Sequence, residues 1–311
     1  MLSDDAALDW ILSEIDQPFA NRFGRQLRSL RSQGRIHIFS AEYDDEGINN
    51  RAGLVLQTEP LATISAESPA RILFMKKAVW AGPKALSLDT RKLDAPSGGN
   101  KAWDEVMRLL TERCRALSTT TVIATPRCSF FGSPTAINEI LLKKAGFVLK
   151  SRIHQFWCST SAQIPTALLD REFALTQDSQ HTTNDTEFIE TVFAHDPTAR
   201  LAGSIGDEPE VGRDHSLFRI HRESRLQALM LLSRHDREIA EIAFLGVAPE
   251  ARRQGLATQM LQSAVRFASK ADLQGLTVAT TECNEPAMRL YRKAGFQLAH
   301  RFGLYELTIQ I

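Results

Sequence analysis

The chain has 311 residues, of which 43% are hydrophobic and 24% charged, and its 37 Lys and Arg balance 37 Asp and Glu. This length favours two domains, and the composition excludes a disordered or low-complexity chain. The formal net charge of zero excludes a global positive field that would recruit nucleic acid or an acidic membrane surface. We therefore expect neither nucleic acid nor a membrane as a partner.

The cysteines and the N-terminus indicate a reducing compartment. The four cysteines are far apart and form no C-x-x-C pair, so they predict reduced thiols and neither a zinc site nor a disulfide framework. The histidines show no metal-binding spacing, so no metal is expected. The N-terminus lacks the features of a signal peptide, and no stretch approaches the ~18 apolar residues that span a bilayer. We expect a cytoplasmic protein.

Hydrophobic periodicity predicts alternating strands and helices. A helix is expected within the first 33 residues, where apolar residues recur at helical spacing. In the first half, strands are predicted at 35–41, 52–56, 119–125 and 148–158, and helices at 104–117 and 137–145. In the second half, strands are predicted at 173–176, 216–221, 226–233, 238–247, 276–281 and at the C-terminal end, and helices at 186–194, 256–271 and 286–293. No element is assigned to residues 65–99, a loop is expected at 196–214, and residues 159–165 are the predicted linker.

The two halves share an internal repeat. Lys144-Ala145-Gly146-Phe147 matches Lys293-Ala294-Gly295-Phe296, and each tetrapeptide ends a predicted helix. Gly99 precedes a strand residue, Val122, by the same distance as Gly255 precedes Val278. Matched order, spacing and element type predict a duplication, with domains at 1–160 and 168–311.

The most informative segment begins with a predicted strand that contains Glu241, turns at Pro249 and enters a basic, glycine-containing loop before a helix. Free backbone N–H groups and the helix dipole would meet at this loop, which suits a phosphate or pyrophosphate. Gly255 permits close backbone approach, and Arg252 and Arg253 add positive charge. The loop matches neither a Walker loop nor a dinucleotide fingerprint. The alternative is an ordinary helix N-terminus with two solvated arginines.

A second segment, from Asn284 to Phe296, reads N-x-x-A-x-x-L-Y-x-K-x-G-F, and it follows the first, which reads R-x-x-G-x-A from Arg252. In this order, with a strand and a helix between them, the two segments resemble the GNAT superfamily of acyl-CoA-dependent N-acetyltransferases. The resemblance covers residues 173–311, and the duplicated layout resembles tandem GNAT proteins of the mycothiol synthase type. It implies two tandem α/β domains, each a mixed, mostly antiparallel sheet flanked by helices.

The resemblance also implies roles for residues of the second half. The residues that would hold the pyrophosphate of acetyl-CoA, the implied cosubstrate, are Arg252, Arg253, Gln254, Gly255, Leu256, Ala257 and Thr258. The strand residues that would follow the pantetheine arm are Leu245, Gly246 and Val247. Asn284 would meet the same arm from the other side. Glu241 matches the general base of tandem members, and Tyr291 matches the tyrosine that protonates the leaving thiolate.

The chemistry of amide formation is consistent with these roles. The reaction needs a neutral amine, whereas a free alkyl ammonium has a pKa near ~10, so a carboxylate is needed to accept its proton. We expect acetyl transfer to a primary amine by direct attack, with Glu241 as general base and Tyr291 as general acid. The alternatives are an exposed Glu241 carboxylate paired with an arginine on a neighbouring strand, and a core aromatic role for Tyr291 beside Leu290.

The first half departs from the family pattern. Counting from Gly99 or Gly146 aligns Ala85 with Glu241, Pro96 with Arg252, Lys101 with Ala257 and Leu142 with Tyr291. The first half therefore lacks the acid and an open helix start, whereas the proline-rich residues before Gly99 leave the position of its carboxylate open. We expect a degenerate domain that serves packing or completes the acceptor pocket.

Two other functions stay open. One is a non-catalytic acyl-CoA-binding regulatory protein, although the presence of Glu241 and Tyr291 argues against it. The other is a tandem GNAT enzyme that uses aminoacyl-tRNA, against which the neutral charge and the intact pyrophosphate loop both argue. The sequence does not determine the acceptor, whether a small-molecule or a protein amine, nor the acyl-chain length or the oligomeric state.

Overall fold

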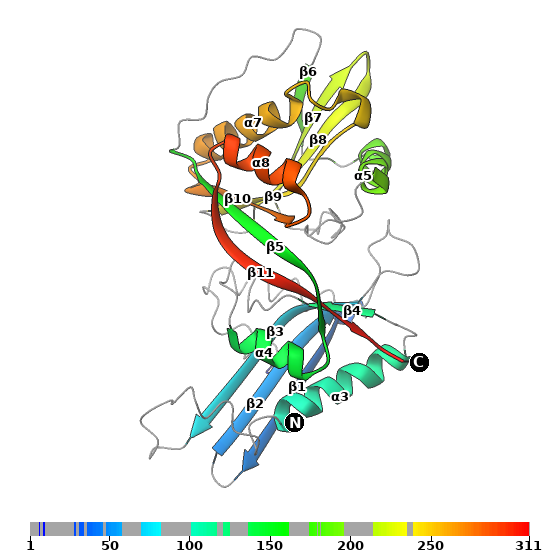
Figure 1. Ribbon diagram of the computed structural model, residues 1–311, viewed down its shortest axis with the longest axis vertical. Helices are drawn as coiled ribbons and strands as arrows, with labels where there is room; N and C mark the ends of the chain where they lie inside the picture. The colour runs from blue at the N-terminus through cyan, green and yellow to red at the C-terminus, as the bar shows by residue number, and fades with distance from the viewer. Residues whose placement is uncertain are drawn as a thin grey trace. The chain divides into compact units, whose positions relative to one another are not determined.

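The protein is described from a computed structural model (Figure 1). The structure describes residues 6, 9, 28, 31–33, 36–45, 48–57, 70–81, 101–116, 121–124, 136–161, 174–178, 180, 182–195, 214–234 and 239–310. Contacts between Cα atoms divide the chain into two compact units. Unit 1 contains Met1–Pro60, Ile64–Lys150 and Gly303–Ile311, and unit 2 contains Leu61–Thr63 and Ser151–Phe302.

Unit 1 has a mixed sheet with the strand order β1-β2-β3-β4-β11. Its strands are β1 (Ile36–Asp45), β2 (Ile48–Gln57), β3 (Ala70–Ala81), β4 (Thr121–Ala124) and the C-terminal part of β11 (Gln297–Thr308). Its helices are α3 (Lys101–Ala116) and α4 (Ala136–Lys144). Val106, Leu110 and Cys114, at helical spacing on α3, pack in one buried cluster with Val122 of β4 and Leu142 of α4.

Unit 2 has the strand order β5-β10-β9-β8-β7-β6. Its strands are β5 (Val148–Ser159), β6 (Ala174–Asp178), β7 (Asp214–Arg222), β8 (Arg225–Arg234), β9 (Ile239–Val247) and β10 (Gly275–Thr281). Its helices are α5 (Thr183–His195), the 3₁₀ helix η2 (Pro249–Ala251), α7 (Leu256–Lys270) and α8 (Glu285–Lys293). Helices α7 and α8 share the main core with one face of the sheet, and Val192 of α5 packs with Phe244 and two leucines on the other face.

Every strand and helix predicted after residue 34 is present, with ends that differ by a few residues. Among the described residues the one additional strand is β3, which lies within residues 65–99, where the residue pattern predicts no element. In the sequence, Pro69 precedes this strand and Pro83 follows it. A proline inside the strand would remove a hydrogen bond of the ladder, but a proline outside it does not. The expected N-terminal helix and the loop at 196–214 lie almost wholly outside the described residues.

The repeated tetrapeptide forms the same helix end in both halves. Gly146 and Gly295 have φ angles of 85° and 86°, a left-handed conformation that favours glycine. Phe147 donates its backbone N–H to the carbonyl oxygen of Leu142, and Phe296 to that of Tyr291, each over 3.0 Å. This shared geometry confirms the predicted alignment of Leu142 with Tyr291.

The strand that follows each copy of the repeated tetrapeptide joins the sheet of the other unit. Strand β5 follows α4 in the chain, yet its residues from Ile153 to Ser159 pair with β10 in unit 2. Strand β11 follows α8, yet its residues from Tyr305 to Thr308 pair with β4 in unit 1. The two units therefore have boundaries that differ from 1–160 and 168–311, because the last strands of the two repeats are exchanged.

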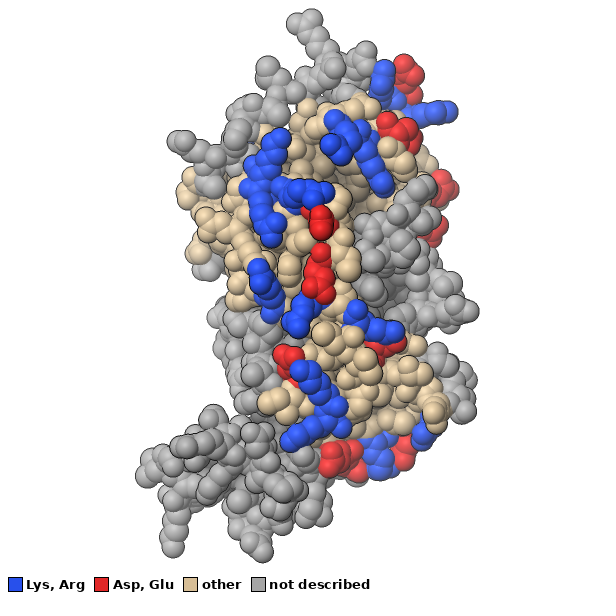
Figure 2. Space-filling view, in the orientation of Figure 1, with Lys and Arg blue, Asp and Glu red and all other residues tan. Residues whose placement is uncertain are grey.

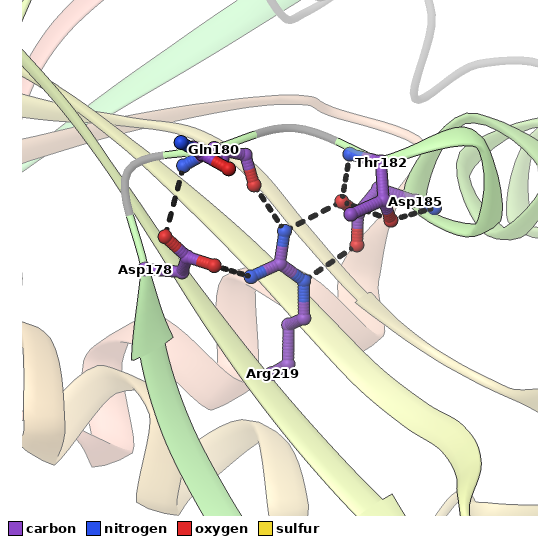
Figure 3. Close-up of polar contacts among 5 residues, drawn as sticks. All are labelled: Asp178, Gln180, Thr182, Asp185 and Arg219. Atoms are coloured by element: carbon purple, nitrogen blue, oxygen red, sulfur yellow. Dashed lines mark hydrogen bonds and ion pairs between the residues drawn. The ribbon is translucent and has the colours of Figure 1, made fainter.

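A buried ion pair joins the first turn of α5 to β7 (Figure 3). Arg219 donates from Nε and Nη2 to the two carboxylate oxygens of Asp185, over 2.7 and 2.6 Å, and also from Nη2 to the carbonyl oxygen of Gln180. Thr182 donates its backbone N–H and its hydroxyl to the same carboxylate. Burial raises the pKa of Asp185, but the hydrogen bonds from Arg219 and Thr182 outweigh burial, so the pKa lies below its ordinary value.

Replacing Asp185 with asparagine should lower the free energy of unfolding by about 3–5 kcal/mol, because a buried guanidinium loses its counter-charge. Urea unfolding at neutral pH measures this loss. Asp178→Asn is the matched control, since its carboxylate lies 3.6 Å from the same guanidinium but is 50% exposed, and we expect a change below about 1 kcal/mol. Because the native pKa of Asp185 is lowered, its contribution is present above the unfolded pKa of ~3.9 and is lost as the pH falls through the native pKa. Equal losses in both variants would contradict this account.

Candidate active site

The site begins where two parallel strands separate. β9 and β10 pair from Gly275 with Ile239 to Val278 with Ile242, but β9 continues to Val247 and β10 to Thr281 without pairing further with each other. At this point β9 also has an extra residue, Ala243, because Leu232 pairs with Ile242 and Leu231 with Phe244. Such a bulge bends a strand and redirects the side chains that follow it.

A cavity of about 800 Å³ lies where β9 and β10 diverge. It is lined by β9 from Ile242 onward, by the loop before α7 and by the first turn of α7. Residues 278–280 of β10, one face of α8 and Val192 of α5 complete the lining. The charged residues that line it are Arg252, Arg253, Arg289 and Lys293. Figure 2 shows Lys and Arg side chains gathered over α7 and α8, with acidic side chains beside them. A cavity whose charged lining is basic favours an anionic ligand.

The loop between β9 and α7 and the first turn of α7 both line this cavity. Gly255 has a φ of 82° and offers no side-chain cap to α7, and the first intrahelical bond runs from Gln259 N to Gly255 O over 3.1 Å. The amides of residues 256–258 in the first turn therefore have no intrahelical acceptor. Arg252 donates from Nε to the carbonyl oxygen of Val247 over 3.3 Å, which holds the loop against the end of β9. This arrangement suits a phosphate group.

The structure brings most of the predicted site residues together. Those that line the cavity are Leu245, Gly246, Val247, Arg252, Arg253, Gly255, Leu256, Ala257, Thr258, Asn284 and Tyr291. Gln254 is outside the lining and donates from its amide to the carbonyl oxygen of Glu250 over 3.3 Å. Glu241 is also outside the lining, one residue before the first cavity residue of β9.

Two cationic lining residues, Arg289 and Lys293, are not among the predicted site residues. They lie four residues apart on α8, so they share one face of the helix with the cavity-lining Pro286 and Leu290. Their four-residue spacing on a predicted helix is the sequence signal that could have identified them as site residues. Arg289 also donates to Glu285 over 2.8 Å, an exposed pair one turn apart.

Tyr291 is both a packed aromatic and a cavity residue. Its ring centroid lies 5.7 Å from that of Phe156 and 6.1 Å from that of Phe296 within the main core of unit 2. Burial, as the only cause, raises the pKa of its phenol above the ordinary value. The hydroxyl therefore stays protonated over the physiological range, as a proton donor must.

Glu241 lies on the opposite face of the sheet from Tyr291. Its neighbours Ala240 and Ile242 belong to the core beneath α7 and α8, so alternation directs the Glu241 side chain to the α5 face. In register it is flanked by Ser233 of β8 and Thr277 of β10. Only 9% of the residue is exposed, so the alternative of an exposed strand carboxylate is wrong.

The first repeat has the same bulge but different residues. Leu56 pairs with Ile72 and Val55 with Phe74, and the parallel pairing of β3 with β4 ends at Ile72, as that of β9 ends at Ile242. This register aligns Arg71 with Glu241, so the alignment of Ala85 with Glu241 is wrong. Counting from Gly99 fails because residues 82–100 join β3 to α3, whereas residues 248–255 join β9 to α7.

The described residues contain neither a candidate metal site nor a candidate membrane span. Within these ranges no group of three or more His, Cys, Asp or Glu side chains could hold a metal ion. No helix in the described part of the chain has the length and apolar character needed to cross a membrane.

Comparison with known proteins assigns this site to a family. Residues 177–296 match the family model of the acetyltransferase (GNAT) family. Unit 2 thus carries a GNAT acetyltransferase domain, which places the protein among acyl-transferring enzymes. No curated protein matches the sequence significantly.

Solved structures share the fold over nearly the whole chain. A tandem GNAT protein from the clavulanic acid biosynthesis pathway has a TM-score of 0.60 at 14% identity, covering 99% of this chain and 97% of its own. A GCN5-related N-acetyltransferase from Sphaerobacter thermophilus has a TM-score of 0.54 at 13% identity, covering 98% and 90%. One from Kribbella flavida has a TM-score of 0.53 at 14% identity, covering 90% and 94%. The predicted tandem GNAT fold is confirmed; the closer resemblance to mycothiol synthase stays a prediction.

Proposed function

We propose that the second repeat transfers an acetyl group from acetyl-CoA to a primary amine by direct attack, with Glu241 as general base and Tyr291 as general acid. The observation that carries this proposal is the cavity at the split between β9 and β10. Its charged lining is basic, the first turn of α7 forms part of its wall, and so does the buried Tyr291. The acceptor would be a small-molecule or protein amine, in a cytoplasmic setting, without nucleic acid, membrane or metal.

The parts of acetyl-CoA would follow one another along the cavity. The pyrophosphate would lie at the first turn of α7, beside Arg252 and Arg253. The pantetheine arm would run along the open edge of β9, where Leu245, Gly246 and Val247 line the cavity and no longer pair with β10. The six residue steps from Val247 back to Glu241 span about 20 Å of extended strand, a length comparable to that arm.

The opposite placement of Glu241 and Tyr291 suits a displacement reaction. Glu241, on the α5 face, would accept the ammonium proton, directly or through a water. The amine nitrogen then forms the C–N bond with the thioester carbonyl carbon as the C–S bond breaks. Tyr291, on the α8 face, would give its proton to the departing thiolate. The nucleophile and the leaving group would thus be served from different sides of the sheet.

Calorimetric titration of the full chain with acetyl-CoA tests the cofactor site. The full chain is needed because β5 belongs to the sheet of unit 2. We expect one site per chain, and at least about a tenfold loss of affinity in Gly255→Ala, since a left-handed φ strains any other residue by about 1–3 kcal/mol at the phosphate loop.

Gly295→Ala is the matched control for Gly255→Ala. It imposes the same strain at a φ of 86°, and at both glycines an added Cβ meets no atom within 4 Å, but Gly295 does not line the cavity. Its affinity for acetyl-CoA should match that of the wild type. Two sites per chain would contradict a degenerate first repeat, and no binding would overturn the proposed function.

A non-catalytic acyl-CoA-binding protein is the second candidate, because Glu241 lies just outside the cavity lining. Turnover separates the two functions. Release of free CoA that depends on added primary amine supports the enzyme, whereas acetyl-CoA binding without turnover of any amine supports the binding protein.

A further inference from the structure

The cavity is lined from both faces of the unit 2 sheet. Leu245 and Val247 of β9 pack on the core beneath α7 and α8, whereas Phe244 of β9 packs with Val192 of α5 on the opposite face. All four residues line the cavity. A ligand in the split between β9 and β10 would therefore contact side chains from both faces.

On the α5 face the cavity lining is apolar. Val278 of β10 belongs to the core beneath α7 and α8, so alternation directs its neighbour Ala279 to the α5 face. The lining residues of this face are Val192, Phe244, Gly246 and Ala279. The cationic lining residues come instead from the loop before α7 and from α8. The α5 face therefore offers its wall to an apolar part of a ligand.

The ring of Phe244 is held in place by its neighbours. A Cβ atom added to Gly246 would lie 2.5 Å from Cζ of Phe244 and 3.1 Å from Cγ2 of Val192, so the ring lies directly against the Gly246 backbone. Phe244 is 4% exposed, and it shares a buried cluster with Val192, Leu217 and Leu229. Because protein interiors are close-packed, the ring cannot retreat from the cavity without displacing these neighbours.

The proposed binding mode brings the acyl group to this wall. The pantetheine arm would follow residues 245–247, and the thioester would lie between that stretch and Glu241. Phe244 is the residue of β9 in this interval whose side chain packs on the α5 face. The sulfur atom would face Tyr291 on the α8 face, so the acyl carbons would extend toward Phe244 and Val192.

We propose that Phe244 and Val192 form the pocket for the acyl group, and that the ring of Phe244 closes this pocket beyond the two carbons of an acetyl group. This inference rests on the proposed function and adds the selection of acyl-chain length to it. Further methylene groups would overlap a ring that the surrounding core holds in place, and forcing extra atoms into a packed site is unfavourable. Phe244 is thus a specificity-determining residue for the acyl donor.

The test measures binding and needs no knowledge of the acceptor amine. The full chain is titrated calorimetrically with CoA, acetyl-CoA and butyryl-CoA. We expect the wild type to bind butyryl-CoA at least about tenfold more weakly than acetyl-CoA, because a closed pocket rejects two added methylene groups by this factor or more.

Phe244→Ala should reverse this order by opening the pocket. Each methylene group that becomes buried contributes about fourfold in affinity, so butyryl-CoA should bind about tenfold more tightly than acetyl-CoA in this variant. The Kd of unacylated CoA should stay within a few-fold of the wild-type value. Phe244→Leu removes less of the core and should reduce the preference for acetyl-CoA partially, which keeps the inference testable if Phe244→Ala does not fold.

Leu217→Ala is the matched control. Leu217 of β7 belongs to the same buried cluster as Phe244 and is 1% exposed, but it does not line the cavity. Its truncation should lower the midpoint of thermal unfolding, because it leaves a void in the core on the α5 face. The wild-type ratio of the two Kd values should remain.

Three results would overturn the inference: equal affinity of the wild type for acetyl-CoA and butyryl-CoA, an unchanged ratio in the folded Phe244 variants, or the same change of ratio in Leu217→Ala. Equal weakening of all three ligands in Phe244→Ala would also overturn it, since the ring would then support the fold of the site and not the choice of acyl group. Failure of the wild type to bind acetyl-CoA would contradict the proposed function itself, which keeps the two failures distinguishable.

Discussion

Replacing Glu241 with glutamine is expected to lower kcat/KM at pH ~7 by about 10²–10⁴-fold, the range that a general base contributes. The amide cannot accept the ammonium proton, so only the small neutral fraction of the amine can react. The Kd of acetyl-CoA should stay unchanged, because Glu241 does not line the cavity in which we propose that acetyl-CoA binds. Steady-state kinetics with calorimetry on the same preparation measures both quantities.

The pH dependence sharpens this prediction. As the pH approaches the amine pKa of ~10, the neutral fraction grows and the deficit of Glu241→Gln should shrink. Glu250→Gln, which removes an exposed carboxylate at η2, is the control and should behave like the wild type. Parallel loss of turnover and cofactor binding in Glu241→Gln would instead indicate a structural role for this buried carboxylate.

Replacing Tyr291 with phenylalanine is expected to lower kcat by about 10²-fold or more, because the thiolate would leave without a proton donor. The folded state should lose little stability, since the ring keeps its packing against Phe156 and Phe296. Thermal unfolding and turnover measured together separate the two effects.

Tyr305→Phe is the control for Tyr291→Phe. This buried tyrosine of unit 1 donates its hydroxyl to Glu139, so its loss should lower the free energy of unfolding by about 1 kcal/mol and leave kcat unchanged. Because burial raises the pKa of Tyr291, kcat of the wild type should not fall through phenol ionisation below pH ~10. Unaltered kinetics in Tyr291→Phe would remove it from the mechanism.

Local features were predictable because they depend on residues close together in the chain. The helix ends at Gly146 and Gly295 follow from the left-handed φ that glycine adopts readily, and both are present. The turn and loop before α7 follow from Pro249, Gly255 and the helix after them. The placement of Tyr291 in the cavity follows from its position on α8, the helix that carries the second sequence motif.

The alignment of the first repeat beyond its helices was not predictable by counting. The connection between β3 and α3 is longer than its counterpart between β9 and α7, so distances measured from Gly99 align Ala85 with Glu241. Pairing with β2 and β4 instead aligns Arg71 with it. Neither Ala85 nor Arg71 is a carboxylate. The degenerate first domain therefore stays a prediction, and it now depends on Arg71 instead of Ala85.

The sequence by itself determined the duplication, the order of helices and strands after residue 34, and the loop and helix that line the cavity, because hydrophobic periodicity, glycine φ and helix starts are local properties of the chain. Only the tertiary structure decided that β5 and β11 are exchanged between the repeats, that β9 and β10 separate after Ile242, and that Glu241 and Tyr291 lie on opposite faces of the sheet. These features depend on hydrogen bonds between strands far apart in the chain and on the bulge at Ala243, and neither leaves a periodic signal in the sequence.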